Sequence, residues 1–527
     1  MSPTWRRWLA GVPAAAWGLS LVTNGAKTQG SLALIETLLL GGLGAWMYAG
    51  GKLLRENWQK PLAAFGLWLP VTLLSPGSLT DHLLHAVWIV SLTAFFFMAR
   101  YLWNEREHEL FLSSIVGAGI INILCMVLQA TRGAQPLGLF SANPNYSGTL
   151  IVAAILVSLV RLRHRFSFYG ITLFLLIAGL SRLHSRGAWL ALAVGVSCVA
   201  YRRWKMKGIL AAAALLSLWI LLLPGHYAFE LSKLGSGPDA LARPLIWKSA
   251  VAMITEYPVT GWGAGNFEQG FQLHPVLSRD GLFQYEKTTV FAHSLYLQIA
   301  AELGIPALLF FLWAAGSFWK STEPDAETRP LLIALLVQGA FDMIFALPAL
   351  SLLLVGAAAA TAPRPDRESA VVALDGRARK GVGVLALGAV LLLGVAPRWD
   401  NLSDSGFWEN QAALRGQDHA WGEAFLAYEK AEDLDPYHAP LYCEAGELAL
   451  FHGDAPRAEE EFRKCLDLEP NALRAWRGLA AALRGEGRRL EAARLESSLR
   501  PVTDRIQKQL NNSHQNPSHY AVYLLGF

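Results

Sequence analysis

Three basic side chains that lie far apart in the sequence have the residue types needed to bind a phosphate group and move a proton. Arg186 and Arg243 carry planar guanidinium groups, which match phosphate oxygens geometrically. Pro244 suits the first turn of a helix, whose free N–H groups would add to an anion site beside Arg243. His293 can gain or lose a proton near neutral pH, and it stands immediately before a long apolar run. Each also has a purely structural explanation, such as a snorkelling arginine or a histidine at a helix end. Where these residues lie relative to the membrane therefore decides between a structural and a functional role.

The composition indicates an integral membrane protein. Of the 527 residues, 53% are hydrophobic and 16% are charged, whereas a soluble protein carries about 25% charged residues. A membrane hydrocarbon core about 30 Å thick needs roughly 17–25 mostly apolar residues per helix. Such runs recur from Leu9 to about Pro397 and predict an all-α, multi-pass transmembrane bundle at residues 1–399. The first run follows two arginines as in a signal peptide, but the many later spans favour an uncleaved helix. Thirteen spans are predicted, at about residues 8–23, 31–50, 61–75, 82–99, 112–131, 147–160, 167–181, 187–201, 208–224, 294–317, 330–346, 348–361 and 381–397.

Lys and Arg residues gather on one side of these spans. With a cytoplasmic N-terminus, the inside segments carry 20 of them, whereas the short outside segments carry four: Lys27, Arg132, Arg182 and Arg186. Cytoplasmic loops are enriched in Lys and Arg, so this orientation is predicted for a bacterial inner-membrane protein. It places the large loop at 224–293 and everything after about residue 400 in the periplasm or outside the cell. The 20 inside residues are Arg6, Arg7, Lys52, Arg55, Lys60, Arg100, Arg106, Arg161, Arg163, Arg165, Arg202, Arg203, Lys205, Lys207, Lys320, Arg364, Arg367, Arg377, Arg379 and Lys380.

Further polar residues lie on the predicted outer rim. Asn143 and Asn145 flank a proline just before the sixth span, where a turn that caps the helix is the simplest interpretation. Arg182 and His184 lie in the tight turn that leads to Arg186. Positive charge on an outside turn opposes the usual charge bias. We therefore treat these four residues as secondary candidates for ligand binding.

The two arginines and the histidine are all predicted at the same rim of the membrane. A site that binds a lipid diphosphate at the membrane surface and deprotonates an incoming hydroxyl needs such a set. Asp342, within the span pair at 330–361, is an intramembrane carboxylate, and such residues are functional by default. The pair itself is predicted to be a broken or re-entrant element. The role of Glu302 in the tenth span is left open.

Two other features bear on cofactors. The glycines of GWGAGNF, residues 261–267, resemble a phosphate-binding loop, but no strand precedes them and nucleotides are scarce outside the cell. The four cysteines form no metal-binding spacing, so neither a metal nor a cofactor is predicted. Cys443 and Cys465 could pair in the C-terminal domain, although their spacing does not require it.

Residues 400–527 are predicted to form a helical repeat domain. The region is rich in Ala, Glu, Arg and Leu, and two segments match at an offset of 34 residues. This period, with proline after the second helix and small residues where the helices cross, resembles the tetratricopeptide repeat. Such helix pairs stack into a groove that binds peptides or proteins, although capping of the membrane domain is an equal alternative. The matched positions are Leu434–Pro436 with Leu468–Pro470, Gly453 with Gly487, Ala424 with Ala458 and Ala492, and Tyr428 with Phe462.

Residues 110–320 resemble the O-antigen ligase and polymerase superfamily of bacterial envelope glycosyltransferases. The motifs are FSANPNYSG, SRGAWLAL, RPLIWKSA followed by YPVTGWGAGNF, and AHSLYLQIAAELG, in that order. The resemblance implies an undecaprenyl-diphosphate-linked glycan as donor and an acceptor hydroxyl outside the membrane, without nucleotide sugar or metal. It also implies that Arg186 and Arg243 contact the donor diphosphate and that His293 activates or orients the acceptor.

Several functions share such a donor site. The leading prediction is an O-antigen ligase-like enzyme of lipopolysaccharide and polysaccharide biosynthesis. Simple lipopolysaccharide ligases lack a repeat-like C-terminal domain. Its presence here favours two alternatives, an O-antigen or exopolysaccharide polymerase and a protein O-oligosaccharyltransferase. A polysaccharide or lipid flippase and a membrane-anchored scaffold are alternatives from other classes. The predicted partners are the lipid-linked glycan, a lipid, glycan or protein acceptor, the bilayer and a protein bound through the repeats, with no nucleic acid.

Overall fold

The computed structural model describes residues 3–222, 238–274, 289–362 and 405–499, together with residues 371–372, 381 and 388. Short pieces inside these ranges lie outside the description, namely 27–28, 51–52, 55, 78, 141–142, 184, 325, 435, 437 and 469–471. In the described part, the predicted all-α fold is confirmed. Its only strands there are β1 (Leu53–Leu54) and β2 (Val371–Val372), which pair antiparallel.

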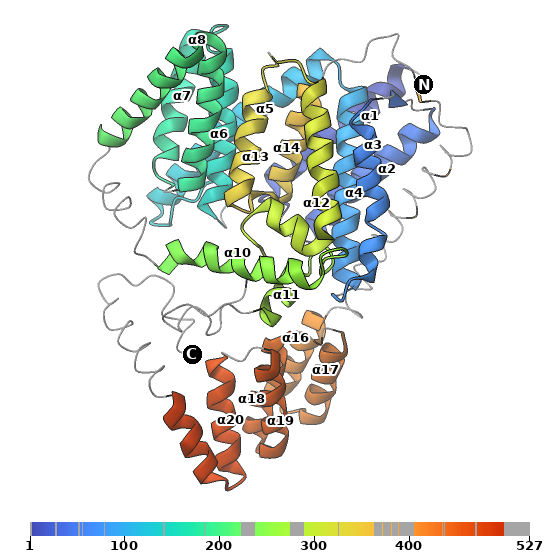
Figure 1. Cartoon of the computed structure of the whole chain (residues 1–527), viewed down its shortest axis with the longest axis vertical. Coiled ribbons are helices and arrows are strands. Elements are labelled where there is room, and N and C mark those ends of the chain that lie inside the picture. The colour runs from blue at the N-terminus through green and yellow to red at the C-terminus, as the bar shows by residue number, and fades with distance from the viewer. Residues whose placement is uncertain are drawn as a thin grey trace.

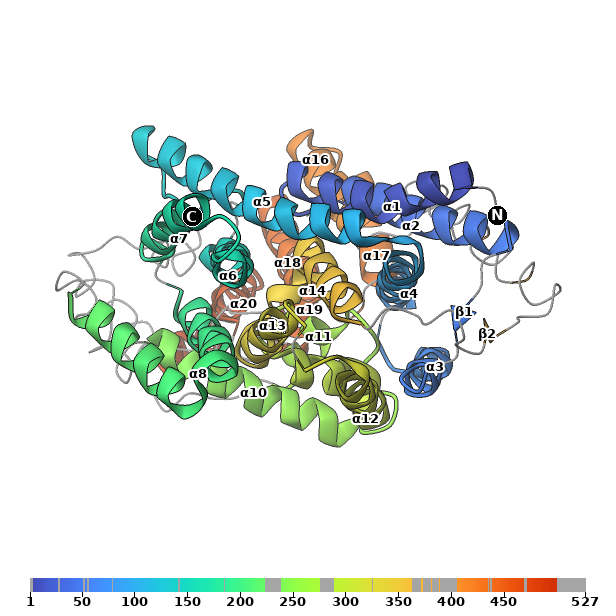
Figure 2. The same cartoon turned by 90° about the horizontal axis from the view of Figure 1, so that it is seen from above.

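The N-terminal part of the protein is a bundle of apolar helices (Figures 1 and 2). Among the described residues, five helices are long and apolar enough to cross a membrane, and three shorter helices are also apolar. This confirms a multi-pass membrane protein. The helices are α1 (Pro3–Val22), α2 (Gln29–Tyr48), α3 (Gln59–Trp68), the 3₁₀ turn η1 (Val71–Leu74), α4 (Leu79–Leu102), α5 (Glu105–Thr131), α6 (Pro144–Arg161), α7 (Phe166–Leu180), α8 (Arg186–Leu222), α12 (Leu295–Ser321), α13 (Arg329–Phe341), the 3₁₀ turn η3 (Ile344–Ala346) and α14 (Pro348–Thr361).

The predicted count of thirteen spans is not confirmed, and some of the predicted spans differ in the structure. The predicted span at 61–75 is the ten-residue α3 followed by η1, because Pro70 cannot continue the hydrogen-bond ladder of a helix. The predicted spans at 187–201 and 208–224 lie on α8 as far as the structure describes them, to Leu222. The backbone leaves helical geometry between them, at Lys205, with φ 54° and ψ −139°, so the predicted division into two spans agrees with the structure.

The last predicted spans have different outcomes. The pair at 330–361 forms two short helices, α13 with 13 residues and α14 with 14, joined by η3. The interruption expected at Asp342 and Pro348 is therefore present. The predicted span at 381–397 lies almost wholly outside the described residues.

Helix α6 forms the centre of the bundle. Every residue from Leu150 to Val157 is buried, and α6 packs against α5, α7, α8 and α13. Small residues allow these close approaches: a Cβ added at Gly148 would lie 2.9 Å from the Cβ of Ala188. A Cβ added at Gly119 would lie 2.5 Å from the Cβ of Ala154. In a membrane, where helices gain little from the hydrophobic effect, such backbone contact is a main source of packing energy.

Contacts between loops divide the bundle into two ends. At the end that we call the basic end, Arg202 donates to the carbonyl of Ala326 at 2.9 Å and Arg163 lies 4.0 Å from Glu327. At the opposite end, which we call the site end, the amide of Ala264 donates to His82 Nδ1 at 2.8 Å. At each end, the contacting residues are thus predicted on the same side of the membrane, with His82 at the outer end of the predicted span 82–99.

Two helices of the large loop lie across the site end (Figure 1). These are α10 (Pro238–Glu256) and α11 (Phe267–Leu273). Helix α10 buries Ile246, Ala250 and Met253, at helical spacing, in a cluster with residues of the loop and of α12. Pro244 was expected in the first turn, but the helix begins six residues earlier and contains this proline.

The C-terminal helices lie on the same side of the bundle as α10 and α11 (Figure 1). Successive helices pack against one another, and a disulfide joins Cys443 of α18 to Cys465 of α19 with 5.6 Å between their Cα atoms. Closing a loop of this length stabilises a domain by about 3 kcal/mol. The paired positions Gly453 and Gly487 both have positive φ, at 88° and 81°. These features agree with a repeat, whose tetratricopeptide identity stays a prediction. The helices are α16 (Ser405–Gln417), α17 (Trp421–Leu434), α18 (Ala439–His452), α19 (Ala455–Leu468) and α20 (Leu473–Gly485).

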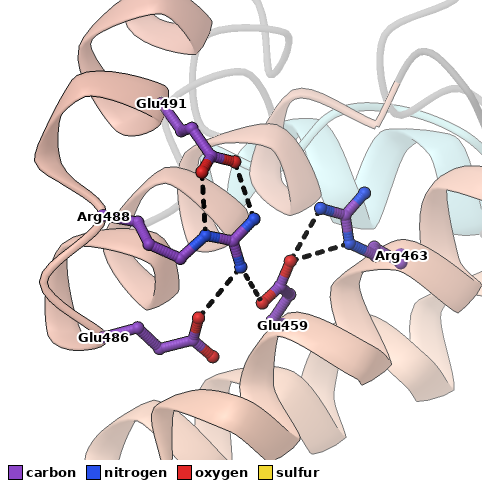
Figure 3. A network of polar contacts seen from close by, with 5 residues as sticks. All are labelled: Glu459, Arg463, Glu486, Arg488 and Glu491. Carbon is purple, nitrogen blue, oxygen red and sulfur yellow. Dashed lines mark hydrogen bonds and ion pairs between the residues drawn. The ribbon is translucent and has the colours of Figure 1, made fainter.

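A surface network ties α19 to the segment that follows α20 (Figure 3). Arg488 lies 2.7 Å from Glu459, 3.0 Å from Glu486 and 2.6 Å from Glu491, while Arg463 also binds Glu459 at 2.7 Å. Partial burial opposes ionisation of Glu459, but the two arginines outweigh it and lower the pKa of this carboxyl. The network is therefore charged at neutral pH and weakens only in acid.

Glu432 at the end of α17 gives the C-terminal helices an opposite pH dependence. Burial, with the charge of Glu461, raises the pKa of Glu432 to about 7. Since the folded state holds this proton more tightly than the unfolded chain, whose carboxyl has a pKa near 4.5, the free energy of unfolding falls as pH rises from about 4.5 to 7.

We expect Glu432→Gln to slow hydrogen exchange of α17 and α19 at pH 8 and to change it little at pH 5. Equal effects at both pH values in the full-length protein would contradict this.

Candidate active site

A buried carboxylate lies where α13 ends. Asp342 is the residue after α13, and its backbone N–H still donates to the carbonyl of Gln338 at 2.9 Å. Its Oδ1 accepts from the backbone N–H of Met343 at 2.9 Å, which fixes the side chain. Only 3% of the side chain is exposed. A buried charge of this kind requires positive partners.

Two of the predicted site residues supply these partners. Arg243 of α10 has Nη2 at 3.5 Å from Asp342 Oδ2, and His293 has Nδ1 at 3.6 Å from Asp342 Oδ1. Both distances exceed those of ordinary hydrogen bonds, so the contacts are electrostatic. The side chains of Arg243 and His293 are 38% and 33% exposed. Each thus faces the buried carboxylate on one side and solvent on the other.

The third predicted residue, Arg186, begins α8 beside this group. A Cβ added at Gly187 would lie 3.8 Å from Asp342 Oδ2, so the first turn of α8 packs directly on the carboxylate. Ser185 holds this turn, because its hydroxyl donates to Asn145 Oδ1 at 2.6 Å and accepts from the amide of Ala188 at 3.2 Å. The Arg186 side chain is exposed and forms no ion pair with any residue that the structure describes.

Several buried polar atoms around Asp342 have no hydrogen-bond partner within the described part of the chain. They include both side-chain atoms of the Gln338 amide, His293 Nδ1 and Asp342 Oδ2. The Gln338 side chain also borders Gly187, at 3.8 Å from the position of an added Cβ. Since buried polar groups are normally hydrogen-bonded, this gathering is suited to a polar ligand.

His293 has a strained backbone. Its φ is 51°, in the left-handed region, although it is not a glycine. This conformation costs about 1–2 kcal/mol for a residue with a side chain. Strain of this kind persists only where surrounding contacts hold it, and it clusters at functional sites. The amide of Ala292 provides one such contact, donating to Gln298 Oε1 at 2.6 Å.

The glycine-rich loop serves a structural purpose. Gly261, Gly263 and Gly265 all have positive φ, between 68° and 92°. A Cβ added at Gly261 would lie 2.3 Å from the backbone of Glu302, and one at Gly265 would lie 2.3 Å from the ring of His85. The glycines therefore allow the loop to pack closely on α12 and α4.

The secondary candidates lie in different places. Asn143 caps α6, accepting from the amide of Asn145 at 2.8 Å, so the predicted capping turn is confirmed. Asn145 supports the Arg186 turn through Ser185. Arg182 is exposed in the turn after α7, and no contact among the described residues joins it to Asp342. His184 lies outside the described residues.

Two residues that the structure places at or beside this site were not among the predicted site residues. Asp342 was noted only as a carboxylate within a span, and nothing in its neighbourhood along the chain pointed to Arg243 or His293. Gln298 was missed, although its spacing of four residues from Glu302 places the two on one helical face. Within the described residues, no cluster of His, Cys, Asp or Glu could hold a metal ion.

The fold and this site define a multi-pass membrane protein with a basic, carboxylate-anchored site at one end of its helices. Residues 171–312 match the family model of the O-antigen ligase domain, which confirms the predicted resemblance to that superfamily. The match runs from α7 into α12 and includes the three predicted site residues, whereas Asp342 lies beyond it. A comparison with curated proteins finds no match.

We expect Asp342→Asn to loosen both segments that converge on this carboxylate. Loss of two ion pairs with partly exposed partners, each contributing about 0.2–1 kcal/mol, should speed amide exchange roughly tenfold at residues 243–250 and 289–294. Hydrogen exchange followed by mass spectrometry measures this. The control is Glu56→Gln, which breaks the ion pair of Glu56 with the buried Arg100 at the basic end, 3.4 Å apart. Unchanged exchange in Asp342→Asn would contradict the anchoring role.

Proposed function

We propose that the protein transfers a glycan from an undecaprenyl-diphosphate-type carrier to an acceptor hydroxyl at the site end of its membrane domain. One observation carries the proposal. Arg243 and His293 meet at the buried carboxylate of Asp342, beside the turn that bears Arg186. The O-antigen ligase match over residues 171–312 supports a transferase of this class.

The donor diphosphate suits the two arginines. Arg243 has its other donor hydrogens free of Asp342, and Arg186 extends from the first turn of α8, where backbone N–H groups favour an anion. Negative charge grows on the leaving diphosphate as the sugar departs. Hydrogen-bond donors that are already in position stabilise this developing charge, and the loss of one such group typically lowers the rate a hundredfold to a thousandfold.

An apolar groove beside the site suits the lipid part of the donor. It has a volume of about 340 Å³ and runs between α12 and α13. Its lining begins with Tyr296 and Phe341, which are three residues after His293 and one before Asp342, and it extends to Trp319 near the other end of α12. A polyprenyl chain in this groove would bring its diphosphate to the arginines.

His293 has the geometry of a general base held by a carboxylate. Its Nδ1 faces Asp342, which leaves Nε2 for the acceptor hydroxyl. In the proposed step, the hydroxyl proton passes to Nε2 as the hydroxyl oxygen forms a bond to the anomeric carbon. The bond from that carbon to the diphosphate breaks with its electron pair on the phosphate oxygen. Asp342 then stabilises the imidazolium, as carboxylates do in other base dyads. Attack from the opposite face inverts the anomeric configuration.

The acceptor distinguishes the related activities. A ligase, a polymerase and a protein-glycosylating enzyme need the same donor site and differ in which hydroxyl attacks. The C-terminal helices lie on the same side of the bundle as α10 (Figure 1). Their position favours a role in presenting an acceptor or a partner protein at the site, as a tetratricopeptide-like groove would.

The sidedness is proposed from two observations. The disulfide between Cys443 and Cys465 belongs to an oxidising compartment, which in a bacterium is the periplasm or the cell exterior. The basic end also carries Arg163 and Arg202, which the charge bias assigns to the cytoplasm. Both observations support an inner-membrane protein whose site end and C-terminal domain lie outside the cytoplasm.

We expect substitutions at the three basic residues to lower the rate of transfer by purified protein at least about a hundredfold. Arg186→Ala and Arg243→Ala should lower kcat/KM by about 10²–10³ each. His293→Asn should lower it by about 10²–10⁴, and asparagine tolerates the left-handed backbone at this position. The measurement is glycan transfer from an undecaprenyl-diphosphate donor in detergent, with Arg132→Ala as an exposed arginine control.

Normal product from all three variants would refute the assignments. A flippase would give no product in detergent even as wild type. A scaffold would lose its cellular function when residues after 400 are deleted and keep it in the arginine variants. Gel analysis of surface glycans in a deletion strain separates the acceptors, because loss of a whole ladder indicates a ligase and collapse to one repeat unit indicates a polymerase.

We expect thiol labelling to report the compartment of the C-terminal domain. In denatured protein isolated from cells, a polyethylene glycol maleimide should modify two cysteines before reduction and four after it, since Cys125 and Cys198 are free. Cys443→Ser should raise the unreduced count to three by freeing Cys465. Four adducts on unreduced wild-type protein would contradict an oxidising location.

A further inference from the structure

Helix α12 is broken near its start, and the break exposes backbone carbonyls. Gly304 has φ 83° and ψ 166°, and Pro306 has no N–H to donate to the carbonyl of Glu302. In an unbroken helix the amide of Ile305 would donate to the carbonyl of Ala301. It donates instead to the carbonyl of Pro258, at 2.8 Å. Two carbonyls of α12 are therefore free of their usual helical partners.

The glycine-rich loop occupies these positions. The amide of Trp262 donates to the carbonyl of Ala301 at 2.9 Å, and the amide of Gly263 donates to that of Glu302 at 2.8 Å. The carboxylate of Glu302 accepts in turn from the backbone N–H groups of Gly265 and Phe267. Glu302 is thus held by the loop through both its backbone and its side chain.

A short chain of hydrogen bonds leads from this anchor to His293. Gln298 Nε2 donates to Glu302 Oε1 at 2.8 Å, and Gln298 Oε1 accepts from the amide of Ala292 at 2.6 Å. The Gln298 side chain is buried, and its oxygen holds the peptide immediately before the strained residue His293. Its amide group fits this place because it accepts at one end and donates at the other.

We infer that Gln298 and Glu302 are positioning residues that hold the left-handed turn at His293 and so aim its imidazole. Neither side chain touches the reacting atoms of the step proposed above, on which this inference rests. Loop residues 261–267 lock Glu302, Glu302 orients Gln298, and Gln298 fixes the peptide of Ala292. Through this chain of contacts, packing of the external loop controls the orientation of the His293 imidazole.

The experiment measures kcat and donor KM for glycan transfer by the full chain. Misplacement of a reacting group by about 1 Å costs about a hundredfold in rate. Gln298→Ala should therefore lower kcat tenfold to a hundredfold and leave the donor KM within threefold, because Arg186 and Arg243 are untouched. Glu302→Gln keeps the size of the side chain but loses acceptor capacity, so it should give a smaller loss. Gly261→Ala, which forces a Cβ against Glu302, should reproduce the Gln298→Ala defect.

Two comparisons separate positioning from general destabilisation. In a His293→Asn background, Gln298→Ala should cause no further loss, since the two act as one unit. Gln59→Ala is the matched control: Gln59 also accepts from a backbone amide, that of Glu56 at 3.1 Å, and donates to Tyr101 at 3.1 Å, but at the basic end. It should leave kcat within twofold of wild type.

Additive losses of Gln298→Ala and His293→Asn, or a wild-type kcat in Gln298→Ala, would overturn the inference. Hydrogen exchange of residues 289–294 gives a readout independent of transfer, and it should accelerate in Gln298→Ala but not in Gln59→Ala. If the wild-type chain transfers no glycan, the proposed function fails. Unchanged exchange in Gln298→Ala would then still overturn the positioning role by itself.

Discussion

The carboxylate of Asp342 lies in a place where a lone charge is too costly to bury, and the external loop meets the membrane bundle there. It ends a helix inside the bundle, with 3% of its side chain exposed. The required compensation comes from Arg243 in α10 of the large loop, from His293 at the end of that loop, and from the adjoining first turn of α8. One buried charge therefore brings together segments that are more than 150 residues apart along the chain.

The helices around this charge end or break where their backbone can be covered by protein. A freed carbonyl or N–H within a membrane is tolerated only when another part of the protein satisfies it. Helix α12 breaks at Gly304, and the loop supplies the amides of Trp262 and Gly263. Helix α13 stops at Asp342, whose side chain accepts from the next amide. Irregular backbone thus marks the candidate site, and the same contacts that satisfy it also place the side chains of that site.

Much of the plan could be predicted from the sequence, because it depends on residue type and local pattern. Apolar runs gave the helical membrane class, and charge bias singled out Arg186 as an arginine on the wrong side of a span. The break at 330–361 followed from Asp342 and Pro348. Span boundaries were predicted less well, as α3 shows, because the apolar run at 61–75 predicts a single span although it contains Pro70, after which only a 3₁₀ turn follows. The pairing of Asp342 with Arg243 and His293, and the positive φ of His293, depend on tertiary packing that no local pattern encodes.

The graded exposure of the site matches the different origins of the two substrates proposed for it. Asp342 is buried, Arg243 and His293 are about one-third exposed, and Arg186 faces solvent. A lipid-linked donor would approach from the apolar groove whose lining includes Phe341, next to Asp342. The proposed hydroxyl acceptor would approach from water, on the side where α10 and the C-terminal helices lie. A base in the proposed step would therefore stand at the boundary between the two substrates, held in place on one side and open to solvent on the other. The fixed peptide before His293 and the carboxylate behind its ring meet both requirements.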